Sequence, residues 1–126
     1  MRAIDTNVLV RIITRDDTRQ AAAADSFVER GAWVSILALA EASWVLDTAY
    51  ELTAADLATA IDMLRNHQDL TIQDPELVAA ALDLFRQRPG LGFSDCLMLE
   101  LARKAGHLPL GTFDRDLGKV EGTQKL

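Results

Sequence analysis

The chain has 126 residues, 49% of them hydrophobic and 25% charged, with one cysteine and a net charge of −6 at pH 7. These values indicate a globular domain rather than a disordered chain, and no apolar run is long enough to span a membrane. The lone Cys96 excludes an internal disulfide, and the acid at position 5 comes too early for a signal peptide, so we expect one cytoplasmic domain over residues 1–126.

The predicted elements alternate between short apolar strands and longer helices, which favours βα units and an α/β fold with a mostly parallel sheet. The tail after Leu117 can add a short edge strand. With N-caps included, we expect in chain order a strand at 1–4, helices at 8–13 and 17–30, a strand at 33–35, helices at 35–50 and 53–66, a strand at 70–72, helices at 74–87 and 94–105, and a strand at 108–113.

The helix starts are indicated by short polar side chains that can accept hydrogen bonds from free backbone N–H groups. Ser35, Thr53 and Ser94 stand at such N-cap positions, and Asp17 is a candidate for the helix that follows it. Asp74 precedes a proline at the first helical position, which also favours a helix start.

Three acidic residues are predicted at positions that a ligand can reach. Asp5 follows the first strand and Asp114 follows the strand at 108–113. Residues just past the carboxyl ends of parallel strands face the crevice where open α/β sheets bind ligands. Asp95 lies in the first turn of a helix, after a glycine-containing loop. Each acid alone is more typical of a turn or a helix cap, so only their combination indicates a site.

Glu41 differs from these acids because its neighbours are apolar. On its predicted helix, the residues three and four positions away are Leu37, Ala38, Trp44 and Val45, all on the same face. A buried carboxylate without a partner is costly, and this face offers no basic residue. We therefore expect Glu41 to be neutralised, paired with a base, or placed on a cation.

Four acids from separate elements would repel one another if the fold brought them together, and a divalent cation would relieve that repulsion. Mg²⁺ and Mn²⁺ prefer carboxylate and water oxygens. Mg²⁺ keeps several waters, one of which can attack a phosphodiester, and two ions about 4 Å apart can hold both the attacking and the leaving oxygen. The candidate metal ligands and catalytic residues are Asp5, Glu41, Asp95 and Asp114, with Asp116 as an auxiliary acid that is more typical of a solvated turn.

Other residues with reactive or aromatic side chains are less informative. His67 and His107 match no metal-binding spacing, and we expect both at the surface. Trp33 and Trp44 are predicted core residues rather than platforms for base stacking, and Cys96 is a predicted small core residue.

The charge weighs mildly against nucleic-acid binding, which usually requires a basic surface. Removing four clustered carboxylates from the count would reduce the net charge of −6 to −2. The basic residues gather near both ends of the chain, at Arg11, Arg15, Arg19, Arg103, Lys104, Arg115, Lys119 and Lys125.

Taken together, these motifs resemble the PIN-domain ribonucleases, and among them the VapC-type toxins of type II toxin–antitoxin systems. The order and spacing match over nearly the whole chain. The first motif is similar to Asp5-Thr6-Asn7-Val8-Leu9-Val10, the second to Glu41, the third to Ser94-Asp95 at a helix start, and the fourth to Thr112-Phe113-Asp114-Arg115-Asp116-Leu117.

The resemblance implies a three-layer α/β/α sandwich and an acidic pocket of Asp5, Glu41, Asp95 and Asp114, in which Asp5 and Asp95 are the usual Mg²⁺ ligands. It further implies a homodimer, an antitoxin protein that blocks the site, and a tRNA, rRNA or mRNA substrate, without membrane association. The residues implied to orient the acids are Thr6, Asn7, Ser94 and Thr112.

Two other functions stay open beside a Mg²⁺-dependent endoribonuclease. An aspartate-based phosphohydrolase also places an Asp after its first strand, but the position of its second acid is Asn7 here, and Lys104 is poorly placed as its late lysine. The other is a PIN-like binding or regulatory module without activity, which would not need all four acids.

Overall fold

The computed structural model describes residues 1–126. The predicted helices and strands are confirmed, with ends that shift by at most two residues, and the tail adds a fifth strand. None of the helices has the length and apolar character needed to cross a membrane. The elements in chain order are β1 (Arg2–Ile4), α1 (Thr6–Thr14), α2 (Thr18–Val28), β2 (Ala32–Val34), α3 (Ile36–Thr48), α4 (Ala54–Arg65), β3 (Leu70–Ile72), α5 (Pro75–Gln87), α6 (Phe93–Ala105), β4 (Leu110–Thr112), the 3₁₀-helix η1 (Leu117–Lys119) and β5 (Thr123–Lys125).

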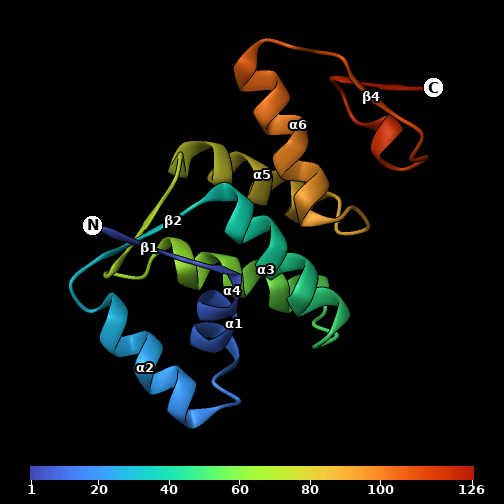
Figure 1. Cartoon of the computed structure of the whole chain (residues 1–126). Helices are drawn as coiled ribbons and strands as arrows, with labels where there is room; N and C mark the ends of the chain where they lie inside the picture. Colours follow the sequence, from blue (N-terminus) through green and yellow to red (C-terminus); the bar gives the residue numbers. More distant parts are fainter.

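The central sheet has three parallel strands in the order β1-β2-β3. Its register sets Ile4 beside Val34 and Val34 beside Ile72, and all three side chains are buried. Right-handed helical crossovers are the usual way to connect parallel strands, and α1, α2, α3 and α4 make these connections here. The fold is a three-layer α/β/α sandwich, as the sequence predicts (Figure 1).

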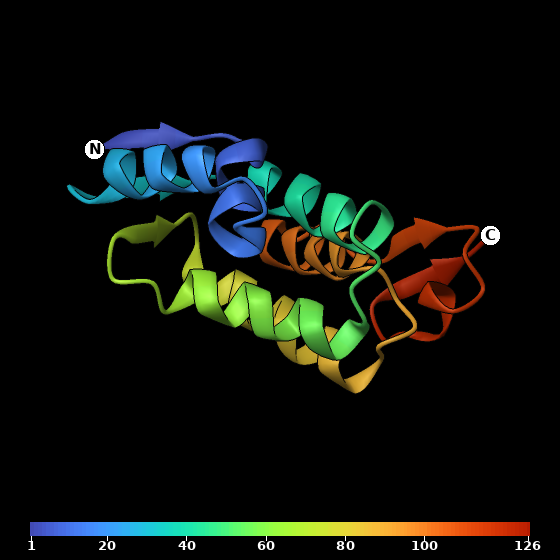
Figure 2. The same ribbon diagram turned by 90° about the horizontal axis from the view of Figure 1, so that it is seen from below.

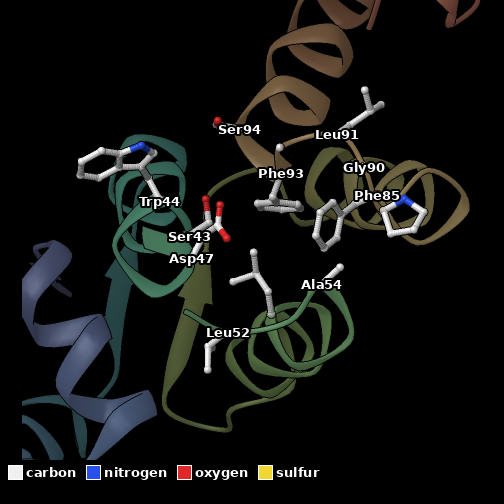
Figure 3. A pocket seen from close by; sticks show the side chains of 13 residues that line it. Ser43, Trp44, Asp47, Leu52, Ala54, Phe85, Gly90, Leu91, Phe93 and Ser94 are labelled. Atoms are coloured by element: carbon white, nitrogen blue, oxygen red, sulfur yellow. The ribbon is translucent and has the colours of Figure 1, made fainter. Parts of the chain in front are cut away.

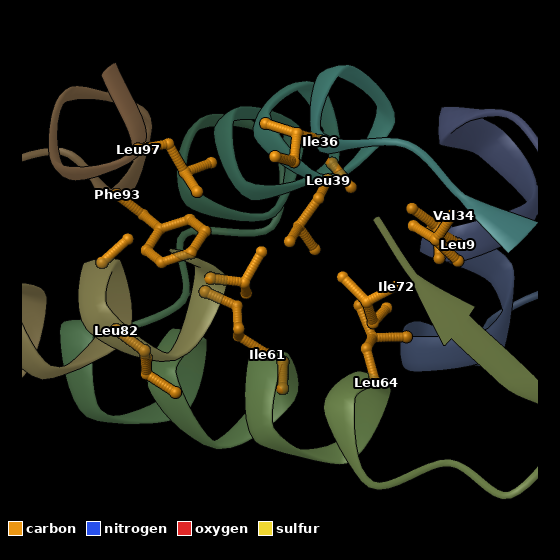
Figure 4. Packing of buried hydrophobic residues seen from close by; sticks show 14 of the residues in the cluster. Leu9, Val34, Ile36, Leu39, Ile61, Leu64, Ile72, Leu82, Phe93 and Leu97 are labelled. Carbon is orange, nitrogen blue, oxygen red and sulfur yellow. The ribbon is translucent and has the colours of Figure 1, made fainter. Parts of the chain in front are cut away.

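One cluster of buried hydrophobic residues joins the sheet to its helices (Figure 4). Val34 and Ile72 of the sheet belong to this cluster together with Leu9 of α1, Leu39 of α3 and Leu64 of α4. Burial of each such side chain stabilises the fold by about 1.5–3 kcal/mol relative to exposure. The core therefore holds α1 and α3 at fixed positions relative to the carboxyl end of β1.

Three helices begin at the caps that the sequence indicates, and a fourth begins at a cap that was not predicted. The side chains of Asp17, Ser35 and Thr53 each accept a hydrogen bond from the backbone N–H three residues later. Asp5 does the same at the start of α1. Such a cap contributes about 1 kcal/mol, so these starts are determined largely by local sequence.

The start of α6 differs from the prediction, because Ser94 is not its cap. The N-cap position is occupied by Gly92, which forms no side-chain hydrogen bond, and the helix begins at Phe93. Phe93 packs edge-on against Phe85 of α5, with 5.8 Å between the ring centroids, and this contact draws the first turn of α6 toward α5. Cys96 on the same helix is buried as predicted, and burial raises the pKa of its thiol to about 12.

The strand β4 does not join the central sheet. It pairs in parallel with β5 in a separate two-stranded sheet, and residues 110–126 are here called the C-terminal unit. Figures 1 and 2 both show this unit beside α6 and away from β1. The prediction that Asp114 follows a strand of the same sheet as Asp5 is therefore wrong.

Contacts with α6 account for the position of the C-terminal unit. Leu117 and Val120 are its buried side chains, and Arg103 of α6 donates a hydrogen bond to the carbonyl of Glu121. The turn before β5 needs Gly122, because residues with a side chain rarely adopt its φ of +93°. Its backbone also lies close to the Arg103 side chain. These contacts turn the chain back onto α6 rather than onto β1.

Candidate active site

Asp5 stands directly after β1 and is the N-cap of α1. Its Oδ1 accepts a hydrogen bond from the N–H of Val8 at 3.1 Å, and the residue is exposed. The cap holds this carboxylate at the carboxyl end of the central sheet, where the sequence predicts it, and leaves Oδ2 without a protein partner.

Glu41 of α3 meets α1 at Thr6. The Thr6 hydroxyl donates a hydrogen bond to Glu41 Oε2 at 2.7 Å, although the two residues are 35 positions apart in the sequence. Because α1 packs against α3, this bond holds the Glu41 carboxylate beside the residue that follows Asp5. Thr6 therefore orients one acid and is the chain neighbour of another.

Half of the apolar face around Glu41 points outward, which contradicts the prediction of a buried carboxylate, while Ala38 is buried and Val45 is half-buried. Leu37 is 69% exposed and Trp44 is 64% exposed, and Glu41 between them is exposed as well. The helix buries another face, with Leu39 and Leu46 in the core. Because α3 is apolar on nearly all sides, its sequence periodicity does not decide which face is buried.

Ser94 of α6 lines a shallow cavity of about 460 Å³ that also contains Glu41. The lining contains Thr6, Glu41 and Ser94, together with Trp44 and Val45. Three of the predicted site residues, from α1, α3 and α6, therefore share one cavity that opens to solvent.

Asp95 lies in the first turn of α6, beside Ser94, and is partly buried. Burial raises the pKa of its carboxyl group, the negative charge of Asp114 raises it further, and the backbone of Gly92 lowers it. The influence of Asp114 means that the acid of the C-terminal unit lies near enough to Asp95 for their charges to interact, although β4 is outside the central sheet.

Asp114 is exposed and forms the turn that leads into η1. Its Oδ1 accepts hydrogen bonds from the N–H groups of Asp116 and Leu117, both at 2.8 Å. The Thr112 hydroxyl accepts a hydrogen bond from the N–H of Asp114 at 3.0 Å, so Thr112 positions this acid from β4. Asp116 is exposed at the start of η1, as predicted for a turn residue.

Asn7 is the predicted site residue that the structure does not bring to the acids. It is exposed, its side chain forms no hydrogen bond, and it lines a different cavity beside Arg11 and Phe27. Nothing in the structure assigns it a role at the site.

The acids match a hard divalent cation in donor chemistry, and the structure groups them in pairs. Carboxylate oxygens are the ligands that Mg²⁺ and Mn²⁺ prefer. The pKa of Asp95 is raised first by burial and second by the negative charge of Asp114, and a cation would offset that second effect. No three acidic, histidine or cysteine side chains converge closely enough to hold a metal ion. Glu41 is held by Thr6, the residue that follows Asp5, and the negative charge of Asp114 acts on Asp95.

The PIN domain family matches residues 3–122. This chain is a PIN domain. A comparison with curated proteins gave no match. PIN domains are generally nucleases, and those nucleases usually use divalent metals. The match extends over both the central sheet and the C-terminal unit, so it contains all four candidate acids.

Most cations of this PIN domain outside the C-terminal unit are engaged by carboxylates. Lys104 pairs with Asp74, so it is not available as the lysine of a phosphohydrolase site. The other engaged cations are Arg11 with Asp16, Arg15 with Asp25, Arg65 and Arg86 with Asp62, and Arg103 with Glu100. In the C-terminal unit, Arg115, Lys119 and Lys125 are exposed and form no ion pair, and two of them stand close to Asp114 in the sequence.

The sequence prediction missed the exposure of the two tryptophans of this PIN domain. Trp33 is 37% exposed and Trp44 is 64% exposed, so the prediction of core positions for both is wrong. A signal for Trp44 was present, because it shares a helix face with the charged Glu41, and a face that carries a carboxylate is more easily exposed than buried.

Proposed function

We propose that this PIN domain is a Mg²⁺-dependent endoribonuclease, with Mn²⁺ as a substitute, and that it is the toxin of a toxin–antitoxin pair. The main support is that residues from α1, α3 and α6 share one cavity, and that two of them, Thr6 and Glu41, are joined by a hydrogen bond. Two of the acids are sequence neighbours of residues that line this cavity: Asp5 precedes Thr6, and Asp95 follows Ser94. An arrangement of oxygen ligands at a strand end and a helix start suits phosphodiester hydrolysis without a protein nucleophile.

Each acid has a proposed task, which the resemblance to PIN-domain ribonucleases implies. Asp5 and Asp95 would hold the cation, with Asp114 and Glu41 as further ligands. Once bound, the cation would lower the pKa of a water molecule and offset the negative charge that builds up on the phosphate. The chain itself contributes orientation: Thr6 fixes the rotamer of Glu41 through its hydroxyl.

The C-terminal unit supplies the proposed contacts with RNA phosphates. It carries three basic and three acidic residues, so the whole excess of six negative charges lies in residues 1–109. Arg115, Lys119 and Lys125 are free of ion pairs and exposed, and salt-dependent contacts of such cations with phosphates dominate nucleic-acid affinity. This distribution reduces the objection that an acidic protein should not bind RNA.

The toxin role rests on the resemblance of the first and last motifs to VapC-type toxins. With this role we also propose a cognate antitoxin protein that covers the site, a homodimer, a cytoplasmic location, and tRNA, rRNA or mRNA as the target. The outward-facing apolar side chain of Leu37 on α3 is available for contact with a partner protein.

The test is RNA cleavage by purified protein freed of any copurifying partner. A pool of tRNAs and rRNA fragments is incubated with Mg²⁺, with Mn²⁺, or with excess chelator. Asp95→Asn is compared with Asp83→Asn, a matched control that removes an exposed acid of α5 outside the site. We expect discrete products that need both the metal and Asp95, and wild-type cleavage by the control.

Two results would overturn the proposal. Wild-type cleavage by Asp95→Asn would mean that the site is elsewhere. If folded protein that binds Mg²⁺ cleaved no RNA, the chain would be a PIN-like binding or regulatory module instead. A phosphoryl adduct on Asp5 would favour the phosphohydrolase, which no observation in the structure favours.

A further inference from the structure

Trp44 is an exposed aromatic side chain that lines the cavity of the candidate site. It lies on α3 three residues after Glu41, is 64% exposed, and lines the cavity that contains Thr6, Glu41 and Ser94. Exposure of so large an apolar surface has a cost that the fold does not recover. An aromatic ring held in solvent beside a catalytic site has the form of a surface for stacking.

A second cavity of about 300 Å³ adjoins the candidate site at Trp44 and Ser94, which line both spaces. Phe85 and Phe93 form an apolar wall and are locked in an edge-to-face pair. Figure 3 shows Trp44 and Ser94 on one side of this cavity and Phe93 on the other. The second cavity therefore adjoins the site. Its lining has the packed pair of Phe85 and Phe93 on one side and the more exposed ring of Trp44 on the other.

The polar groups of the second cavity select the kind of ligand. Asp47 stands one turn after Ser43 on α3, is exposed, and forms no ion pair. The Ser43 hydroxyl is buried and donates its hydrogen to the carbonyl of Ala40, so its oxygen is left as an acceptor. No lysine or arginine lines the cavity. Ser94 adds a third polar side chain, and none of the three is a cation. The absence of a cation disfavours a phosphate group, and the aromatic wall with the Asp47 carboxylate favours a flat ring that presents N–H donors.

We propose that this cavity binds one nucleobase of the RNA substrate, stacked on Trp44 and with its N–H groups donated to Asp47. The proposal rests on the ribonuclease function proposed above and identifies part of its substrate recognition. A carboxylate accepts two hydrogen bonds from guanine, one from the amino group of cytosine or adenine, and one from uracil. The expected order of preference therefore has guanine first, ahead of the three bases that donate one hydrogen bond.

The test measures equilibrium binding of short oligouridylates in chelator, where binding is separated from cleavage. Each oligomer carries one central guanosine, cytidine or adenosine, or none. Trp33→Phe leaves Trp44 as the only tryptophan, so quenching of its fluorescence reports stacking. We expect Trp44→Ala to weaken binding about tenfold or more, and Trp44→Phe to retain most of it. Leu37→Ala, which removes an equally exposed side chain from the same helix outside both cavities, is the matched control.

The base preference is tested with Asp47→Asn. The amide offers one acceptor in place of two, so we expect the guanosine oligomer to lose about tenfold in affinity while the plain oligouridylate changes little. A weaker effect of Asp47→Asn on guanosine than on uridine would contradict the proposed contact.

The outcomes separate this inference from the proposed function. If the wild type cleaves RNA and Trp44→Ala binds it as tightly as Leu37→Ala does, the base-binding cavity is refuted and the nuclease stands. If the wild type neither binds nor cleaves RNA, both proposals fail. If Trp44→Ala leaves RNA affinity intact but changes the sedimentation coefficient of the free protein, the exposed tryptophan belongs to a protein interface and the inference is wrong.

Discussion

The central sheet and the C-terminal unit are held in place by different means. Nearly all the buried side chains belong to the sheet, to its helices and to α6, whereas the C-terminal unit contributes Leu117 and Val120. Its other attachments are the hydrogen bond from Arg103 to Glu121 and the close approach at Gly122. A region with so few buried contacts opens locally at a lower free energy than the core does.

The charges of these two regions differ as well. The central sheet and its helices hold Asp5 and Glu41, and residues 1–109 carry the whole net negative charge. The C-terminal unit holds Asp114 and three cations without ion pairs. Asp95 on α6 stands between them. A site assembled from both regions combines a rigid set of acids with a less tightly held group that can contact RNA, so activity should depend on interactions that barely affect global stability.

The largest expected effect comes from Asp5, the acid that follows β1. Asp5→Asn should reduce RNA cleavage at least about hundredfold, the scale on which electrostatic groups of active sites contribute. Asparagine caps helices as well as aspartate does, so the thermal midpoint should change little. Cleavage and circular dichroism melting are measured on the same samples. A loss of cleavage accompanied by a large fall in the melting temperature would indicate that Asp5 acts mainly as a cap.

The next effect separates the two regions by stability. Leu117→Ala removes a buried side chain of the C-terminal unit, a change that costs about 2–5 kcal/mol in a packed core. We expect faster hydrogen exchange over residues 110–126 and at least about tenfold slower cleavage, with exchange in α4 unchanged. Leu46→Ala, in the core of α3, should instead lower the global free energy of unfolding. Equal protection of both regions in Leu117→Ala would mean that the unit is part of one cooperative core.

A smaller effect is expected from the hydrogen bond that orients Glu41. Thr6→Val keeps the shape of the side chain and removes the hydroxyl, and should slow cleavage about fivefold, which corresponds to about 1 kcal/mol. Thr6→Ser keeps the hydroxyl and should restore most of the rate. Equal rates for the valine and serine variants would show that the bond has no part in the reaction.

The smallest effect on cleavage, close to none, is expected in the rigid body away from the site. Asp62 of α4 accepts hydrogen bonds from Arg86 and Arg65, which lower the pKa of its carboxyl group below the ordinary value of 3.8. A lowered pKa in the folded state stabilises the protein above that value and loses its effect as the pH falls below it. Asp62→Asn should therefore reduce the free energy of unfolding by about 1 kcal/mol at pH 7. Urea denaturation should show the difference shrinking below pH 4, and a difference independent of pH would refute the ionic origin.

The sequence predicted the features that depend on neighbours within one turn. Asp17, Ser35 and Thr53 accept hydrogen bonds from amides three residues later, so their roles follow from local geometry. The order of strands and helices follows from the same local patterns, and the three-layer fold was implied by the family resemblance. Ser94 was misplaced because the contact of Phe93 with Phe85, which decides where α6 begins, joins two helices.

What the sequence did not predict depends on long-range packing. The burial of Leu39 and Leu46 turns Leu37, Glu41 and Trp44 outward, and the periodicity of so apolar a helix does not distinguish the two faces. The separate β4–β5 sheet depends on the contacts of the C-terminal unit with α6. Because a strand of three residues specifies its partner weakly, its pattern could not show which sheet it joins.

The most direct test of a site shared by both regions compares Asp114→Asn, Asp5→Asn and the double variant in one cleavage assay with Mg²⁺. Asparagine retains the Oδ1 that accepts the two amide hydrogens of the turn after Asp114, so the C-terminal unit should keep its structure. We predict that each single variant loses at least about a hundredfold and that the double variant is no slower than the slower single one, because groups that act as a unit are not additive. Wild-type cleavage by Asp114→Asn beside an inactive Asp5→Asn would contradict this account and confine the site to the central sheet and its helices.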